Sequence, residues 1–325
     1  MTRTTSIRLG LIALAALPIA AGQAQSSAAV VGTGYSAPVP IIIAPGALTT
    51  IYVQGIGSAI VSPVLAKALP LPTKLGGISV SLMQTAAPQG PLPVPILAVF
   101  PVAQCRTTLL FKDCGKLTGI NVQIPFEFVP NPSGPPSAPQ NGNWAQLIVQ
   151  EDGGAQVTVE ATPVFDRIHV LGTGDSLKNP AAANVARPIP SLSTSAPIVT
   201  HADGSLVDMG NQADVGETLT LWATGLGWML PMPQSGQATP SPAPTGQVTI
   251  QFDYRPDAAP SLPTAGAPQL AAMTPGFVGL YQVNFVVPQI PPGYQWFCRI
   301  CNSNLTVSIG AITSFDGAGI CVRFP

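Results

Sequence analysis

Charged side chains are scarce in this sequence of 325 residues. Lysine and arginine supply 13 residues and aspartate and glutamate supply 14, so 8% of the chain is charged, against about 25% in an average soluble domain. The near balance of the two signs leaves no basic field for a nucleic acid, and we therefore exclude nucleic acids as partners. A chain with few charges and 46% apolar residues also differs from a disordered tail, which combines high charge with low hydrophobicity.

The sequence leaves little room for long helices. Its 37 prolines and 32 glycines are spread along nearly the whole chain, and proline disrupts the interior of a helix. An all-β fold is therefore the expectation, and the chain length suggests about two domains. After residue 25 there is no run of about 18 apolar residues, so we predict no transmembrane segment in the mature chain.

The N-terminus has the three parts of a secretory signal. Arg3 and Arg8 form a basic region, the stretch 9–21 is apolar, and Gly22-Gln23-Ala24 offers small residues at the cleavage-defining positions. We predict a signal peptide over residues 1–24, cleaved after Ala24, and a mature protein that is secreted, extracellular or on the cell surface. The alternative is an anchor that is retained at the N-terminus.

Five cysteines suit an exported chain, because disulfides persist in oxidising compartments. We predict a disulfide between Cys105 and Cys114, and a second one that joins Cys321 to either Cys298 or Cys301. An odd number leaves one further thiol to be free or to pair between chains. The Cys-x-x-Cys spacing at 298–301 resembles a redox or zinc motif, but no βαβ pattern surrounds it and both histidines lie far away in sequence. We therefore predict no metal and no cofactor.

The chain carries the same pattern twice. Residues 44–57 align with 214–227, and both copies alternate apolar with other residues before closing in Gly-x-Gly, as a half-buried strand that ends in a turn does. The matching positions are Gly46, Thr50, Gly55 and Gly57 with Gly216, Thr220, Gly225 and Gly227. Three further alignments pair 78–82 with 248–252, 120–125 with 283–288, and 155–161 with 305–311.

Short strands of period two separated by turn residues are typical of an immunoglobulin-like β-sandwich. The sequence predicts two such sandwiches in tandem after the signal peptide, over residues 30–163 and 197–325, with a linker or strap at 164–196 that contains one more strand or crosses between the domains. Outward positions of the strands carry hydroxyl and amide side chains instead of charges, as at Ser79, Ser81, Thr249 and Gln251.

Several of the repeated segments also carry a family resemblance. In the first copy they are Ile43-Ala44-Pro45-Gly46, Leu71-Pro72-Thr73 with Gly76-Gly77-Ile78, and Ile120 to Pro125. In the second copy they are Gly225-Leu226-Gly227, Ala272 to Gly279, Leu280-Tyr281-Gln282-Val283-Asn284, Pro288, and Pro291-Pro292-Gly293. These segments resemble the Solibacter-type C-terminal domain family of secreted bacterial proteins. The resemblance implies tandem immunoglobulin-like sandwiches on an exported protein and implies no catalytic residues; the chain departs from the family around 88–116, at Trp228 and at 296–302.

One short motif points to an enzyme. Gly174-Asp175-Ser176-Leu177 spells the signature of a family of serine esterases, and 166–169 has the Asp-x-x-His spacing that could supply the base. That chemistry requires the histidine segment after the serine in an α/β domain, whereas here it precedes Ser176 and no α/β pattern surrounds it. We interpret the motif as a turn in the linker, with a serine esterase as the alternative.

Two other groups of residues are candidates for binding. Four carboxylates gather beside His201 and could supply oxygen ligands to calcium, namely Asp203, Asp208, Asp214 and Glu217, although the EF-hand spacing is absent and the question stays open. Trp228 and Trp296 fall at predicted turns, where an indole could stack on a sugar or pack at the end of a strand.

Because so few ionisable residues remain from which to build an active site, we predict a non-enzymatic protein that is secreted or on the cell surface. Its role would be extracellular binding or adhesion, or structural support, with an unknown extracellular protein or glycan as the partner. The alternatives are a carbohydrate-binding module that uses Trp228 and Trp296, and the serine esterase that uses Ser176.

Overall fold

The computed structural model of the chain describes residues 29–33, 41–85, 90–102, 117–130, 144–175, 196–254, 268, 270–294, 297–299, 301–309 and 315–324. Within these ranges the regular secondary structure consists of β-strands and one turn of 3-10 helix, η3 (Thr173–Asp175). The predicted all-β class is confirmed. No helix in these ranges is long and apolar enough to cross a membrane.

The first part of the chain folds into two sheets. Sheet A contains β1 (Ala29–Thr33), β3 (Leu48–Gln54), β4 (Val64–Leu65), β8 (Ile96–Pro101) and β9 (Leu117–Gln123). Sheet B contains β2 (Ile41–Ile43), β5 (Lys74–Leu75), β6 (Ile78–Gln84), β7 (Leu92–Pro93), β10 (Ala145–Glu151) and β11 (Gln156–Pro163). The strand orders are β1-β3-β9-β8-β4 in sheet A and β2-β11-β10-β6-β5 in sheet B, where β7 also pairs with β6.

The core of this first sandwich lies between sheets A and B. Alternating residues of β6 and β10 point into it, including Val80, Leu82 and Leu147, each at most 2% exposed. Sheet A is also buried on its outer face, where Tyr52 of β3 packs in a second apolar cluster with Phe100 of β8. The strand at 48–54 is therefore covered on both faces, and the prediction that it is half-buried is wrong. The alternation of apolar with other residues predicts which face points into the core, but it does not show what packs against the opposite face.

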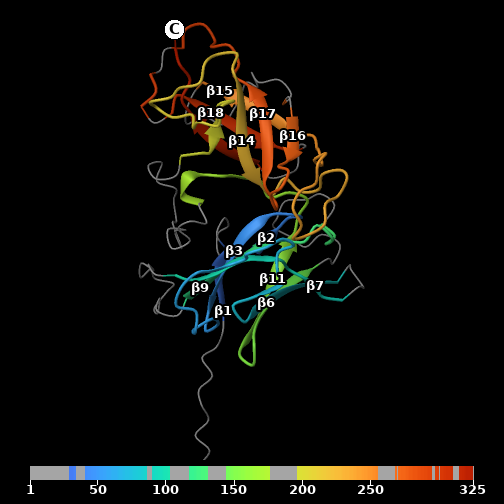
Figure 1. The fold of residues 1–325 in the computed structure, drawn as a ribbon. Coiled ribbons are helices and arrows are strands. Elements are labelled where there is room, and N and C mark those ends of the chain that lie inside the picture. Colours follow the sequence, from blue (N-terminus) through green and yellow to red (C-terminus); the bar gives the residue numbers. More distant parts are fainter. Residues whose placement is uncertain are drawn as a thin grey trace, which may run out of the picture.

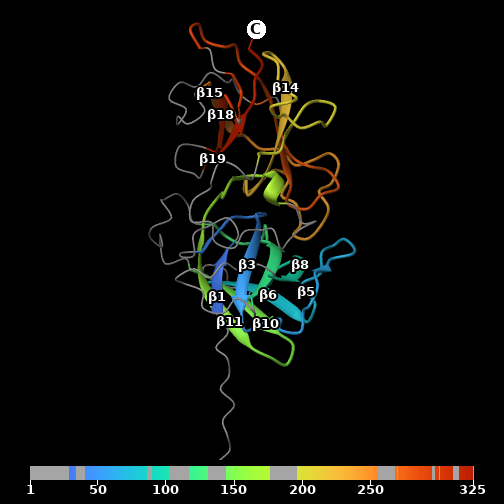
Figure 2. The same cartoon turned by 90° about the vertical axis from the view of Figure 1, so that its left-hand side faces the viewer.

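The second part of the chain folds into two further sheets. Sheet C contains β12 (His169–Val170), β13 (Val199–Thr200), β14 (Thr218–Thr224), β16 (Leu270–Met273) and β17 (Tyr281–Val286). Sheet D contains β15 (Thr249–Asp253), β18 (Ser303–Ser308) and β19 (Phe315–Ile320). The orders are β12-β14-β17-β16, with β13 also on β14, and β15-β18-β19. Figures 1 and 2 show this second sandwich stacked end to end on the first.

Both sandwiches have the immunoglobulin strand order. In that fold, strands A, B, E and D form one sheet and strands C, F and G form the other. Sheet A matches the first set as β1-β3-β9-β8, and sheet B matches the second as β6-β10-β11. In the second sandwich, β14-β17-β16 takes the B-E-D positions and β15-β18-β19 takes C-F-G. The chain thus contains two immunoglobulin-like sandwiches in tandem.

The strand order also tests the sequence repeat. β3 and β14, β6 and β15, and β9 and β17 are equivalent, in agreement with the first three aligned blocks. The matched glycines of the first block adopt matching positive φ angles, 69° and 82° at Gly46 and Gly216, and 75° at both Gly57 and Gly227. The fourth alignment is wrong, because 305–308 lies in β18, the counterpart of β10, whereas 156–161 lies in β11. Adjacent strands with the same alternation cannot be told apart by period alone.

The segment between the sandwiches contains a strand. The short strand β12 pairs antiparallel with β14, with His169 opposite Thr224 and Val170 opposite Ala223. This part of the predicted linker or strap therefore belongs to sheet C, in line with the alternative of one more strand. Residues 176–195 lie outside the described ranges.

Candidate functional site

The described contacts between the two sandwiches are extensive and centre on Phe126. This residue follows β9 of sheet A, is 1% exposed, and packs in the apolar core of the second sandwich. Phe128, two residues further on, is fully buried in the core of the first sandwich. Gly46 leaves room for the Phe126 ring, since a Cβ there would lie 2.2 Å from that ring and 3.0 Å from the Tyr281 hydroxyl. One segment therefore contributes an aromatic ring to each core.

Hydrogen bonds join the backbone around Phe126 to the second sandwich. The Phe126 N–H donates to Ser235 Oγ at 2.7 Å, and the Phe126 carbonyl accepts from Trp228 Nε1 at 2.9 Å. The Glu127 carboxylate accepts from the Ser235 N–H at 3.2 Å and from the Ser235 hydroxyl. Phe126 lies outside the strands, so its N–H and C=O groups have no partner in a sheet. Both groups instead have hydrogen-bond partners in the second sandwich.

Further bonds extend this contact on both sides. The Gly236 N–H donates to Gln123 Oε1 at 2.6 Å, and its carbonyl accepts from the Leu71 N–H at 2.7 Å. The Leu48 N–H, at the start of β3, donates to Thr224 Oγ1, at the end of β14, at 2.9 Å. We call this set of contacts the junction. Because Gln123 is 1% exposed, its bond to Gly236 lies in a region that water does not reach.

The Gly225-Leu226-Gly227 turn requires glycine for its packing. A Cβ at Gly225 would lie 1.9 Å from the Arg167 carbonyl oxygen, and a Cβ at Gly227 would lie 2.3 Å from that of Phe165. Both glycines have positive φ angles, 74° and 75°, which other residues rarely adopt. The segment that enters the second sandwich therefore lies directly against this turn, and the Arg167 N–H donates to the Gly225 carbonyl at 2.8 Å.

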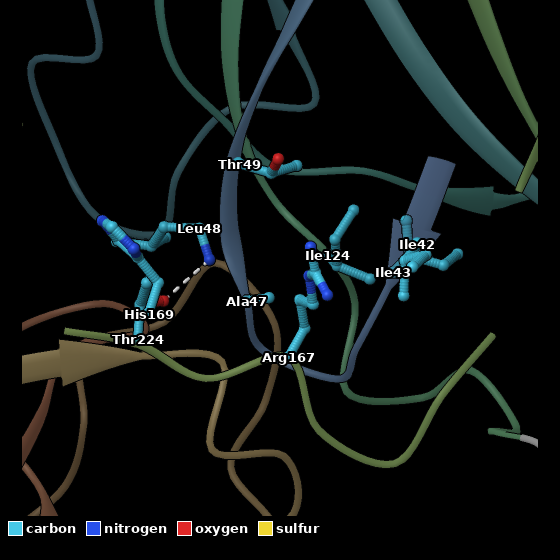
Figure 3. Close-up of a pocket in the computed structure, with 9 residues that line it drawn as sticks. All are labelled: Ile42, Ile43, Ala47, Leu48, Thr49, Ile124, Arg167, His169 and Thr224. Carbon is cyan, nitrogen blue, oxygen red and sulfur yellow. Dashed lines mark hydrogen bonds between the residues drawn. The ribbon is translucent and has the colours of Figure 1, made fainter. Parts of the chain in front are cut away.

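A small cavity lies at the junction, between the start of β3 and the end of β14 (Figure 3). Its lining residues are Ile42, Ile43, Ala47, Leu48, Thr49, Ile124, Arg167, His169 and Thr224. Its volume of about 20 Å³ is enough for a single water molecule. A sugar ring or a peptide side chain does not fit into a space of this size, so we assign this cavity to packing between the sandwiches.

The motif with Ser176 is described only in part. His169 Nε2 donates to Asp175 Oδ2 at 2.9 Å, and the same oxygen accepts from the Gly172 N–H at 2.7 Å. In a Ser-His-Asp triad the carboxylate binds Nδ1, and Nε2 receives the proton of the serine. Here the Asp175 carboxylate binds Nε2 instead, the nitrogen that would face the serine in a triad. This bond holds the turn around η3 in place. Ser176 itself lies outside the described residues.

Asp175 also acts on the first sandwich. Burial, together with the negative charge of Asp175, raises the pKa of Tyr52 to about 12. The hydroxyl of Tyr52 is therefore protonated at every physiological pH, and the turn at 173–175 lies near the outer face of sheet A.

The tryptophans differ in their surroundings. Trp228 is 43% exposed, but its N–H binds Phe126 and its ring packs edge-to-face on Phe165 with centroids 6.1 Å apart. Trp222 is half-buried and donates from Nε1 to Thr200 Oγ1 at 3.2 Å. Trp144 precedes β10 and is 41% exposed. Trp296 lies outside the described residues, so the predicted pairing of Trp228 with Trp296 as sugar contacts is not described.

The carboxylates of the acidic cluster accept hydrogen bonds from residues of the turns in which they lie or pair with Arg323. Asp203 Oδ1 accepts from the N–H and hydroxyl of Ser205, and Asp208 Oδ1 accepts from two backbone N–H groups of the following turn. Asp214 pairs with Arg323 at 3.1 Å, and Glu217 Oε2 accepts from the Asp214 N–H at 2.9 Å. Within the ranges that the structure describes, no group of three or more His, Cys, Asp or Glu side chains is arranged to hold a metal ion. Each of these four carboxylates thus has a hydrogen-bond or ion-pair partner within the chain.

His201 is the centre of this loop. Its Nδ1 donates to Glu217 Oε1 at 2.5 Å, and its Nε2 donates to the Asn211 carbonyl at 3.3 Å. Burial lowers the pKa of His201, but the hydrogen bonds to Glu217 and Asn211, with the charges of Glu217 and Asp203, outweigh it and raise that pKa above its usual value. His201 thus holds the two ends of the 201–217 loop together.

Cys298 and Cys321 form a disulfide with a Cα–Cα distance of 5.5 Å. The sequence left Cys298 and Cys301 as alternatives, and the structure selects Cys298. Cys301 instead lies against Gly319 of β19. A Cβ atom added at Gly319 would lie 2.9 Å from the Cys301 sulfur. Cys105 and Cys114 lie outside the described residues, so their predicted disulfide stays a prediction.

Comparisons with known proteins add little to this picture. No family model matches the chain, and no curated protein matches it. Among solved structures, it is similar to a pullulanase type I from Bacillus subtilis in complex with maltose, with 9% identity, a TM-score of 0.17, and coverage of 87% of this chain and 26% of the pullulanase. It is also similar to a tandem of titin Ig domains, with 8% identity, a TM-score of 0.15, and coverage of 87% and 92%. Similarities this weak carry no argument, so the fold assignment depends on strand order alone.

Proposed function

We propose that this chain is a non-enzymatic protein that acts outside the cell, where its two sandwiches work as one rigid unit for binding or adhesion. The observation that carries the proposal is the position of Phe126, which leaves the first sandwich and is buried in the core of the second. Domains that move independently have polar interfaces of modest size. A ring buried in the neighbouring core instead fixes the angle between the two domains.

The export part of the proposal is supported by the predicted signal peptide over 1–24 and by the disulfide between Cys298 and Cys321, which suits an oxidising compartment. The binding part is supported by the low charge of the chain and its exposed hydroxyl and amide side chains. A rigid pair of domains presents its surfaces at a fixed spacing, which reduces the entropy lost when a large partner is bound.

Two measurements on the mature chain test the proposal. Small-angle scattering is expected to give a single elongated shape for the native chain and a broader distribution for Phe126→Ala. A pull-down from cell-surface extract is expected to retain a protein or a glycan at micromolar concentration. A flexible native chain, or a chain that remains cytoplasmic and unprocessed in a bacterial host, would contradict the proposal.

The enzymatic alternative is tested separately with p-nitrophenyl acetate. We expect no hydrolysis above the rate of a heat-denatured sample. Hydrolysis that Ser176→Ala removes, with unchanged thermal stability, would replace the non-enzymatic assignment by the esterase.

A further inference from the structure

The outer face of sheet B carries an ordered grid of side chains, most of which are polar and uncharged. Inward residues of β6 and β10, such as Val80 and Leu147, are buried in the core, so their neighbours along each strand point outward. The cross-strand register then defines three rows, Met83–Gln146–Glu160, Ser81–Ile148–Thr158 and Ser79–Gln150–Gln156. Neighbouring residues in a row are about 4.8 Å apart, and rows on the same face are about 6.8 Å apart. We call this grid the outer face of sheet B.

The side chains of this face are accessible. Gln156, Thr158 and Glu160 of β11 are exposed, and the outward residues of the central strand β10 are half-exposed. Gln150 is fixed in place, because its amide donates to the Glu151 carbonyl at 2.8 Å. Because the same nitrogen also donates to the Gly154 carbonyl at 3.4 Å, this side chain presents its carbonyl oxygen to a ligand, with little further loss of rotamer entropy.

Trp144 stands at one end of the face. It immediately precedes the buried Ala145, so it points outward on the same side as Gln146, and 41% of it is exposed. Its backbone is held in position by Thr85, whose N–H donates to the Trp144 carbonyl at 3.1 Å and whose Oγ1 accepts from the Trp144 N–H at 3.0 Å. The backbone that carries the exposed indole ring is therefore held in place next to the polar rows.

The charge of this face restricts its partner. Glu160 is the charged residue of the three rows, and at the margin Lys74 and Asp152 pair at 2.7 Å and cancel each other. A nearly neutral face does not attract a highly charged partner, and hydroxyl and amide groups both donate and accept hydrogen bonds. A neutral chain rich in hydroxyl groups complements this surface in charge and in hydrogen-bonding capacity.

A protein partner fits less well. The centres of protein interfaces are enriched in aromatic residues, Met and Arg and depleted in Ser. Here the middle row is Ser81–Ile148–Thr158, and the exposed apolar residues Met83 and Trp144 lie toward one end of the face. Other faces are also less suitable. The outer face of sheet A is apolar and buried, and on sheet C the Thr220 hydroxyl binds Asn284 while Trp222 binds Thr200.

We propose that the outer face of sheet B binds a neutral polysaccharide, whose hydroxyl groups bond to the amide and hydroxyl side chains of the rows while one sugar ring stacks on Trp144. The proposal depends on the extracellular binding role proposed above and names the class of partner for it. The site differs from the Trp228 and Trp296 pair considered from sequence, because Trp228 is engaged at the junction.

Calorimetric titration of the mature chain tests this site with cellohexaose, xylohexaose, mannohexaose and maltohexaose as neutral probes, and with hexagalacturonate as a charged one. We expect at least one neutral probe to bind with a dissociation constant in the micromolar to millimolar range, and the charged probe not to bind. Trp144→Ala is expected to weaken binding by about tenfold, because the sugar ring loses its aromatic contact.

A matched pair of arginine variants locates the site. Ser79→Arg places a long charged side chain on the face, whereas Thr249→Arg places it at the equivalent position of β15 in the second sandwich. We expect Ser79→Arg to abolish binding and Thr249→Arg to leave it unchanged, with both variants retaining the native melting temperature. Equal effects of the two variants, or no binding of any neutral probe, would overturn the inference.

Two other outcomes separate this inference from the proposed function. If surface extract yields a bound protein while the neutral probes do not bind, the extracellular binding role stands and the polysaccharide site is wrong. If sedimentation shows a dimer that Ser79→Arg converts to a monomer, the face is an interface between copies of this chain and the inference is also wrong.

Discussion

The two sandwiches share one strand order but differ in what covers their equivalent C-F-G sheets. In the first, sheet B presents exposed Thr158 and Gln156 on its outer face. In the second, the outward position of Gly319 in sheet D is covered by Cys301, and Asp253 and Thr306 are only 6% and 8% exposed. The same template thus provides a more open face in the first sandwich and a partly covered face in the second, where Thr249 and Gly317 are exposed but Asp253 and Thr306 are buried. The difference lies in the local packing of Cys301 beside Gly319 and not in the strand order, which the two sheets share.

Breaking the junction is expected to have the largest effect. Phe126→Ala removes a buried ring from the core of the second sandwich, and we expect a loss of about 3–5 kcal/mol in the unfolding free energy of that sandwich, as in other Phe→Ala substitutions in cores. Hydrogen exchange measures where the loss falls. Amides of β14 and β17 should lose protection, while those of β10 should not.

Phe128→Ala is the matched control for this substitution. Its ring lies in the first core, so the pattern of lost protection should be reversed, with β10 affected and β14 unchanged. If both variants weakened the same sandwich, the assignment of one ring to each core would be refuted.

Opening the disulfide is expected to have the next largest effect, again confined to the second sandwich. Cys298→Ser removes a cross-link between residues 23 positions apart, which is worth roughly 3 kcal/mol in the chain-entropy account. Chemical denaturation should show this loss, and reductant should lower the stability of the second sandwich in the native chain but not in the variant. A loss in Cys301→Ser that exceeds the loss in Cys298→Ser would favour the alternative pairing that the sequence left open.

The sequence predicted the fold better than it predicted the junction. The alternation of Ser79 and Ser81 with apolar residues identified the outward positions of β6, and the matched glycines identified equivalent turns, because both features are local consequences of backbone geometry. Pairing 155–161 with 305–311 failed because adjacent strands share the same period. Local pattern is therefore enough for strands and turns but not for their order in a sheet.

The junction could not be predicted in this way. In the sequence, Phe126 and Phe128 are two residues apart and look like successive inward residues of one strand, yet each belongs to a different core. The proline at 125 signals that the strand has ended, but it does not show where the next side chain goes. Trp228 likewise follows a predicted turn, and its bond to Phe126 depends on contacts between residues 102 positions apart.

A smaller effect is expected from a single hydrogen bond of the junction. Trp228→Phe keeps an aromatic ring against Phe165 but removes the N–H that donates to the Phe126 carbonyl. We expect a loss of about 1 kcal/mol, the usual net contribution of one hydrogen bond, together with greater motion between the sandwiches in small-angle scattering. Trp222→Phe removes a similar bond within the second sandwich, so it should cost a similar amount without changing that motion. Increased motion in Trp222→Phe would contradict the role given to Trp228.

The smallest expected effect is the dependence of stability on pH, which should differ between the two sandwiches. His201 lies in the second sandwich, so the stability that is linked to its titration belongs to that sandwich. The raised pKa of His201 means that its stabilising bond to Glu217 contributes fully below the unfolded value of about 6.5 and is lost as the pH rises through the folded value. Denaturation of the native chain between pH 5 and pH 8 should show this decline in the second sandwich, and Glu217→Gln should flatten it. A decline of equal size in Glu217→Gln, or one that appears in the first sandwich, would show that another group is responsible.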